Sequence, residues 1–209
     1  MKLETALNFI VGFLAIAGIG GSIYFLFSGG NNEGFQEYPT ITNLHVLPGV
    51  IYLALAPLQF LKSIRSSFGS YHKWIGRLLS LIALVAGSGA MFLGIITPYS
   101  GIPEQIVIAI FGSLFLFSTV RGFFCARARN FNEHREWMIR AFSIGLSIAT
   151  MRLIFVPMLI VIGESSREEA EFFSIVSFTI AFALHSGFAE YWIRHTRSTT
   201  SASATPSTT

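Results

Sequence analysis

Six long apolar stretches constrain this chain more than any other feature of its sequence. A helix needs roughly 20 mostly apolar residues to cross the hydrocarbon core of a bilayer, which is about 30 Å thick. We therefore expect an all-α fold, a polytopic membrane helix bundle with six transmembrane helices, at about 6–27, 44–61, 75–96, 103–125, 137–162 and 172–193. Residues 1–195 would form this single bundle. Residues 196–209, rich in Ser, Thr and Ala, would form a disordered cytoplasmic tail.

The composition does not indicate a nucleic-acid partner. Only 12% of the residues are charged, against about 25% in soluble domains. A nucleic-acid site gathers basic residues on one soluble face, whereas here they lie between the apolar stretches. We expect the lipid bilayer as the main partner, with other membrane proteins as further candidates. The single cysteine, Cys125, excludes an internal disulfide and a Cys-based zinc site, and we predict no metal site.

The distribution of Lys and Arg predicts the orientation of the helices, because cytoplasmic connections carry the excess of these residues. With a cytoplasmic N-terminus, all of the 14 Lys and Arg residues except Arg152 and Arg167 fall on the cytoplasmic side. Most Glu residues fall on the opposite side. We therefore expect a protein of the cell (inner) membrane with both termini in the cytoplasm. The first apolar stretch exceeds the usual length of about 7–15 residues in a signal peptide, so we interpret it as an uncleaved anchor.

Small residues recur four positions apart in several of the apolar stretches. Ala17 and Gly21 are one such pair, and Ala141, Gly145 and Ala149 form a longer series. Helices pack closely in lipid where small residues line their interface. These positions therefore predict helix contacts rather than a functional site.

One short pattern occurs twice: a His, a basic residue, a Trp, and an Arg three positions after the Trp. The copies span 72–77 and 134–140, and each opens a predicted helix on the cytoplasmic side. The hairpins that precede them would then be parallel repeats about an axis along the membrane normal. The alternative is convergence, since Trp and basic residues are common at any membrane interface.

The ordered combination of short motifs between Leu44 and Arg194 resembles a family of multi-pass membrane proteins catalogued as domain of unknown function 2306. The motifs are Leu44-His45-Val46-Leu47-Pro48-Gly49, Ala56-Pro57-Leu58-Gln59-Phe60 with Arg65, the segments 72–77 and 134–140, Arg152-Leu153, and Ala189-Glu190-Tyr191-Trp192. The resemblance implies a helical membrane bundle and no established reaction. In this family Asn is commoner than His at the position of His185, so a role for His185 carries over less readily.

Arg152 is the most informative single residue, because it lies inside the fifth apolar stretch. It lies roughly 22 Å along the helix from Trp137 at a rise of 1.5 Å per residue. A charge at this depth costs about 2.5–3.5 kcal/mol on insertion scales and normally faces the bundle interior. We expect Arg152 to be buried and partnered by His45, by a carbonyl freed by Pro57 or Pro157, or by an anionic ligand.

A second polar group falls within about two helical turns of the predicted cytoplasmic ends. Its members are Gln59, His72, Arg77, His134, Arg140, His185 and Glu190. We expect the rings of His72 and His134 to turn into the bundle, with Gln59 or Glu190 beside at least one of them. The alternative for each ring is a histidine satisfied at the interface. Glu190 is expected to form an ion pair with Arg140 or Arg77.

Three classes of function follow from these residues. The first is redox work, including assistance to respiratory-complex assembly. In this hypothesis His72 and His134 ligate haem b or hydrogen-bond a quinone. Arg77 and Arg140 would hold the anionic groups of the ligand.

The second class is a small-solute or proton carrier that uses Arg152, His45 and Glu190, because ionisable groups inside a membrane often mark such a path. The third class is a lipid-modifying enzyme or a non-catalytic partner in a membrane complex. The sequence contains no nucleophile elbow, phosphate loop or zinc-binding helix motif. It therefore leaves open whether the protein is an enzyme.

Overall fold

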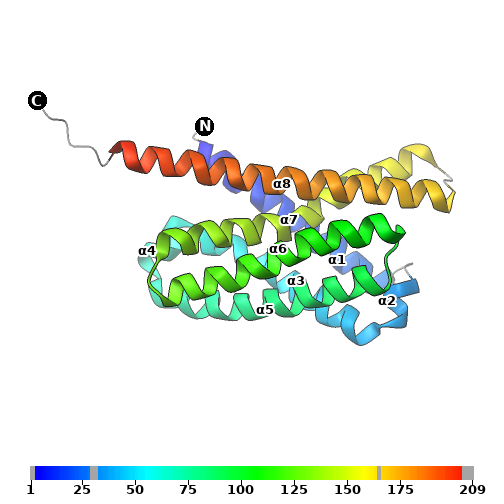
Figure 1. Cartoon of the computed structure of the whole chain (residues 1–209), viewed down its shortest axis with the longest axis horizontal. Coiled ribbons are helices and arrows are strands. Elements are labelled where there is room, and N and C mark those ends of the chain that lie inside the picture. Colours follow the sequence, from blue (N-terminus) through cyan, green and yellow to red (C-terminus); the bar gives the residue numbers. More distant parts are fainter. Residues whose placement is uncertain (1–2, 29–32, 164–165, 204–209) are drawn as a thin grey trace, which may run out of the picture.

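The computed structural model describes residues 3–28, 33–163 and 166–203, and it contains helices and no strand within these ranges. The helices are α1 (Leu3–Ser28), α2 (Glu33–Glu37), α3 (Pro39–Phe60), α4 (Lys62–Ser67), α5 (Gly69–Ile96), α6 (Gly101–Arg127), α7 (Phe131–Ile162) and α8 (Arg167–Ser203). Figure 1 shows the long helices running side by side along one axis, with α8 at one edge.

Six of these helices, α1, α3, α5, α6, α7 and α8, are long and apolar enough to cross a membrane. Their outer faces carry large apolar side chains, such as Phe9 at 76% exposure and Trp74 at 68%. Water would solvate such a belt poorly, whereas lipid tails match it. The prediction of an all-α bundle with six transmembrane helices is confirmed.

The helices extend beyond the predicted apolar stretches at several ends. α3 begins at Pro39, where the sequence predicted residue 44, and α5 begins at Gly69, where it predicted residue 75. Two short helices, α2 and α4, lie in the connections between the predicted apolar stretches. Hydropathy marks only the part of a helix in lipid, while backbone hydrogen bonding continues into polar residues.

α8 continues through Ser203, so the helical part of the chain ends later than the sequence predicted. Two residues of the expected tail contact α7 in the structure. Thr196 accepts a hydrogen bond from Arg135 at 3.1 Å, and Arg197 forms an ion pair with Glu136. These contacts fix a segment that has too few apolar side chains to bury on its own. Residues 204–209 of the predicted tail lie outside the described residues.

Helices that follow one another in the sequence pack side by side, from α3 with α5 to α7 with α8, and α1 packs against both α3 and α7. The central core contains Tyr52 of α3, Phe115 of α6 and Phe142 of α7. The ring centroids of Phe115 and Phe142 lie 6.0 Å and 6.4 Å from the ring centroid of Tyr52. This arrangement places α5 and α7 on either side of α3 and α6 and brings their N-terminal ends to the same end of the bundle.

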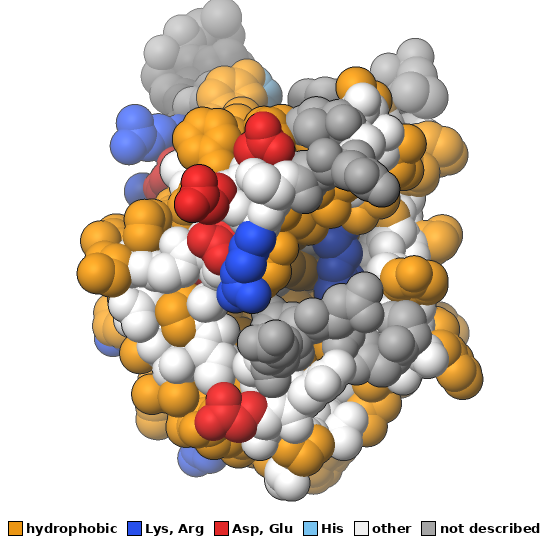
Figure 2. Space-filling model, turned by 90° about the vertical axis from the view of Figure 1, so that its right-hand side faces the viewer, with side chains coloured by type: hydrophobic (Ala, Val, Ile, Leu, Met, Phe, Trp, Pro, Cys, Tyr) orange, Lys and Arg blue, Asp and Glu red, His pale blue; other side chains and the backbone are white. Residues whose placement is uncertain are grey.

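The two ends of the bundle differ in charge. The end that carries α4 and the connection between α6 and α7, on the left of Figure 1, holds most of the Lys and Arg residues; we call it the basic end. The opposite end carries α2 and the connections between α5 and α6 and between α7 and α8. Figure 2 looks onto this opposite end and shows acidic side chains on it and apolar side chains around its flanks.

Reporter fusions test which end of the bundle faces the cytoplasm. By the distribution of Lys and Arg, fusions after Arg65, Arg129 and Arg197 should read cytoplasmic. Fusions after Gly34, Gly101 and Glu168 should read exterior. A single clear reversal among these six fusions would contradict the predicted topology.

Candidate functional site

The two copies of the His and Trp pattern occupy the same place in their helices. His72 is the fourth residue of α5 and His134 is the fourth residue of α7. Their backbone N–H groups donate to the residue that precedes each helix, Phe68 and Asn130, at 3.0 Å in both cases. The two motifs therefore place their histidines at equivalent helical positions. A common origin as a repeat stays a prediction.

The arginines of the two motifs also make the same local contact. The guanidinium of Arg77 lies 4.8 Å from the ring centroid of Trp74, and that of Arg140 lies 4.6 Å from the ring centroid of Trp137. Both separations are within the range of cation–π attraction. Each Trp therefore holds its Arg close to the helix surface at the basic end.

His134 is held in one orientation by α6. Its Nδ1 lies 2.8 Å from the carbonyl oxygen of Gly122. A carbonyl only accepts hydrogen bonds, so Nδ1 is the donor and Nε2 of the neutral ring carries the free lone pair. The Gly122 carbonyl thus leaves the second ring nitrogen of His134 available to accept a proton or bind a metal.

Gln59 and His72 hold buried polar atoms that have no hydrogen-bond partner among the described residues. These atoms are Nε2 and Oε1 of Gln59 and Nδ1 of His72. A Cβ built on Gly76 would lie 3.7 Å from Gln59 Oε1, so this amide faces α5 one turn after His72. An unsatisfied buried polar group costs about 1–3 kcal/mol. A ligand or a water molecule that completes these hydrogen bonds would remove that cost.

The charge of His134 acts on His72, and so does the charge of Arg65 in α4. Gln59 lies in the last turn of α3, and His72 and His134 lie in the first turns of α5 and α7, so all three are at the basic end. We call the group formed by Gln59, His72 and His134 the histidine site. The sequence predicted all three as members of one polar group, and their action as one site stays a prediction.

Glu190 of α8 and Arg140 of α7 form the ion pair that the sequence predicted as one of two alternatives. Arg140 Nε lies 2.5 Å from Glu190 Oε1, and Nη2 lies 3.1 Å from Oε2. Two parallel hydrogen bonds of this kind are stronger and more specific than a single charged contact. Arg140 thus has a partner within the protein, in contrast to its expected role as a holder of anionic ligand groups.

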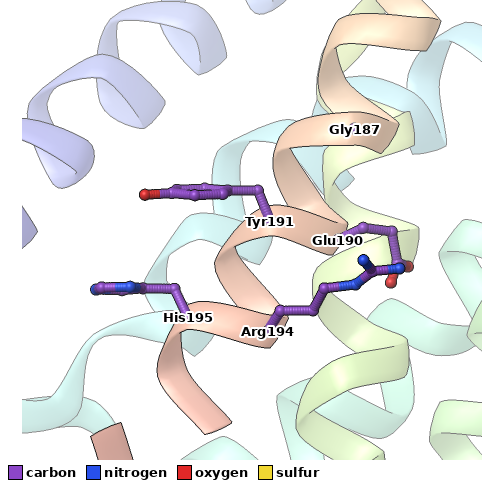
Figure 3. A pocket seen from close by; sticks show the side chains of 5 residues that line it. All are labelled: Gly187, Glu190, Tyr191, Arg194 and His195. Atoms are coloured by element: carbon purple, nitrogen blue, oxygen red, sulfur yellow. The ribbon is translucent and has the colours of Figure 1, made fainter. Parts of the chain in front are cut away.

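Figure 3 shows the surroundings of Glu190 on α8. The side chains of Glu190 and Arg194 point to one side of the helix, and those of Tyr191 and His195 point to the other. The last two rings are stacked, with centroids 6.0 Å apart. Together with Gly187 these residues line an open groove of about 510 Å³. Every lining residue comes from α8, so the groove is separate from the histidine site.

His185 links α8 to α7 and is not a member of the histidine site. Its Nε2 lies 2.8 Å from Thr150 Oγ1. Thr150 lies on α7. This hydrogen bond joins α8 to α7, which suits a helix-linking role for His185.

Arg152 has partners, as the sequence predicted, but they lie on α1. Its Nη1 donates to the carbonyl of Gly18 and to Ser22 Oγ, each at 2.9 Å. No proline frees this carbonyl, which already accepts a hydrogen bond from Ser22. The charge of Arg152 acts on His45. The Nδ1 atom of His45 lies 2.9 Å from the carbonyl oxygen of Ala86. Arg152 therefore ties α1 to α7.

Two residues near the histidine site were not named as site residues from the sequence. Arg65 and Arg135 lie close enough for their charges to interact, and the charge of Arg65 also acts on His72. Arg135 directly follows His134, so the repeated pattern of a histidine followed by a basic residue could have identified Arg135 as a site residue. No group of three or more metal-ligating His, Cys, Asp or Glu side chains occurs in the described part of the chain.

Comparison with known proteins gives one match. The model of a family described as "Predicted membrane protein (DUF2306)" matches residues 42–193, and no curated protein or solved structure matches the chain. The matched region contains the histidine site and Arg152, whereas Gly18 and Ser22 precede it. Since the match covers more than half of the 209 residues, the chain belongs to the DUF2306 family of predicted membrane proteins.

Proposed function

We propose that the histidine site binds the head group of a membrane quinone, in a redox or respiratory-assembly role. One observation carries this proposal: at the end of the bundle that also holds His134, Gln59 and His72 present buried hydrogen-bonding atoms that have no partner among the described residues. A quinone head offers two carbonyl oxygens as acceptors, and the quinol offers two hydroxyl groups. The amide of Gln59 contains both a donor and an acceptor, so it can bind either form.

The histidines supply the proton chemistry that a quinone needs. Reduction of a quinone to a quinol takes two electrons and two protons, and imidazole is the side chain that titrates near neutral pH. His134, fixed by Gly122, can exchange a proton through Nε2. His72 can exchange one through Nδ1 once a ligand pairs with it. The electrons would come from a partner redox protein.

Binding of a short-chain benzoquinone to the detergent-purified protein tests this proposal. Quenching of tryptophan fluorescence provides the signal. Gln59→Leu should weaken binding about tenfold, which corresponds to about 1.4 kcal/mol. Asn132→Leu is the matched control, because Asn132 is an exposed amide at the same end. Equal affinities of the wild type and Gln59→Leu would contradict quinone binding at this site.

A second candidate is haem b ligated by His72 and His134. The observation that favours it is the hydrogen bond from His134 Nδ1 to Gly122, because the second nitrogen of a metal-bound histidine is usually oriented in this way. Haem would connect two imidazoles from separate helices. The protein purified from haem-supplemented cells should then show a Soret band that shifts on dithionite reduction and disappears in His134→Ala. A colourless preparation from such cells would exclude this candidate.

The contacts give less support to the carrier hypothesis. Arg152 bonds to α1, and Glu190 bonds to Arg140 at the basic end. His45 is near Arg152, but Glu190 belongs to a separate group of contacts. No contact among the described residues specifically favours a lipid-modifying enzyme or a non-catalytic membrane partner.

A further inference from the structure

Arg65 and Arg135 have no ion-pair partner among the described residues, although the basic end contains acidic side chains. Glu133 lies 3.8 Å from Arg121, Glu190 pairs with Arg140, and Glu136 pairs with Arg197. The segment 38–103, which includes α3, α4 and α5, has no Asp or Glu at all. The acidic groups are thus used by other arginines, and a surplus of positive charge stays beside the histidine site.

Within the described part of the chain, one hydrogen bond holds each of these two guanidiniums. Arg65 Nη1 donates to the carbonyl of Phe60 at 3.0 Å, and Arg135 Nη1 donates to Thr196 Oγ1 at 3.1 Å. A guanidinium has five N–H donors, so each keeps further donors for a ligand. The contacts to Phe60 and Thr196 hold both side chains in place without neutralising them.

The positive charges also converge. The groups that anchor the two guanidiniums lie on one apolar cluster, because Phe60 packs against the buried cluster that includes Ile193 and Thr196 donates to the carbonyl of Ile193 at 3.2 Å. The charge of Arg65 acts on Arg135 and on His72, while Glu136, whose charge also reaches Arg135, is paired with Arg197. α5 and α7 both begin at this end, so the positive ends of two helix dipoles add to the field. Like charges held together in this way repel one another unless an anion lies between them.

We infer that Arg65 and Arg135 bind a phosphate group at the basic end, next to the histidine site. Guanidinium forks match the oxygen atoms of a phosphate in geometry and charge. The phosphate can belong to an anionic lipid of the adjacent leaflet or to a soluble phosphate compound. This inference does not depend on quinone binding, because it rests on the arginines and not on Gln59.

Protection from arginine modification tests the inference on the unaltered chain. The full-length protein in phosphatidylcholine nanodiscs is treated with phenylglyoxal, and modification of each arginine is measured by mass spectrometry. Phosphatidylglycerol in the nanodiscs should slow modification of Arg65 and Arg135 at least about fivefold, whereas exposed Arg127 should be unaffected. Protection by inorganic phosphate in phosphatidylcholine nanodiscs would assign the site to soluble phosphate compounds. Absence of selective protection by either probe would overturn the inference.

Variants provide a second measurement. The double variant Arg65→Gln/Arg135→Gln should retain phosphatidylglycerol about tenfold less than the wild type in native mass spectrometry after delipidation. Arg127→Gln removes a charge at the same end and should retain lipid like the wild type. Gln59→Leu should also retain it, so loss of quinone binding and loss of phosphate binding are distinguishable. Equal retention by the double variant and the wild type would contradict a phosphatidylglycerol site.

Discussion

Glu190→Leu should lower the free energy of unfolding of the bundle by about 3 kcal/mol. The change leaves the Arg140 guanidinium, whose side chain is only 18% exposed, without its carboxylate between α7 and α8. Removing one partner of a buried ion pair typically costs about 3–5 kcal/mol, because an uncompensated charge stays behind. The 42% exposure of the Glu190 side chain places the expected cost at the lower end of that range.

Unfolding of the purified protein in mixed micelles, followed by circular dichroism during titration with sodium dodecyl sulfate, measures this effect. Glu171→Leu is the control on the same helix, because it breaks the exposed i,i+4 pair with Arg167. That change should cost less than about 0.5 kcal/mol. The double variant Arg140→Leu/Glu190→Leu should recover most of the lost stability. A cost for Glu190→Leu no larger than that for Glu171→Leu would show that the pair is not desolvated.

Gly18→Leu should displace α1 and destabilise the bundle by at least about 3 kcal/mol, the upper end of the usual cost of overpacking. A Cβ at Gly18 alone would lie 2.9 Å from Leu53 Cδ1 and 3.3 Å from Ala149 Cβ. A full leucine side chain has no room between α3 and α7. The displacement would also break the hydrogen bond from Arg152 to the Gly18 carbonyl.

Gly20→Leu is the matched control, because no atom lies within 4 Å of a Cβ built at Gly20. The two variants have the same composition and the same change in helix propensity. The melting temperatures in detergent should therefore differ by several degrees, with Gly18→Leu the lower. Melting temperatures that agree within error would mean that α1 does not pack against Leu53 and Ala149 as described.

The first prediction concerns residues inside the family match, whereas the second concerns α1, which precedes the match. Arg140, Arg152 and Glu190 lie inside the matched residues 42–193, whereas Gly18 lies before them. Arg152 thus joins the matched bundle to a helix outside the match. The hydrogen bonds of Arg152 to Gly18 and Ser22 offset the free energy that burial of its charge costs.

The apolar stretches were enough to predict the six long helices, because a segment in lipid must satisfy its backbone hydrogen bonds internally. They could not predict the ends of α3, α5 or α8. A helix continues past the lipid boundary when its polar turns find partners, as Thr196 and Arg197 do on α7. Local hydropathy contains no information about such partners.

The sequence alone also determined which residue types are costly in a membrane, and so it identified Arg152, His72, His134 and Glu190 as residues that need partners. Their partners depended on which helix faces meet. Gly21 of the predicted pair does pack closely, since a Cβ built there would lie 3.0 Å from Arg152 Cδ. The rotation of α1 also places Gly18 against Ala149 and its carbonyl against Arg152. Likewise, Arg140 rather than Arg77 reaches Glu190, because α8 packs on α7. A rotation of about 100° separates neighbouring residues on a helix, so only the packed bundle decides which polar side chain meets which.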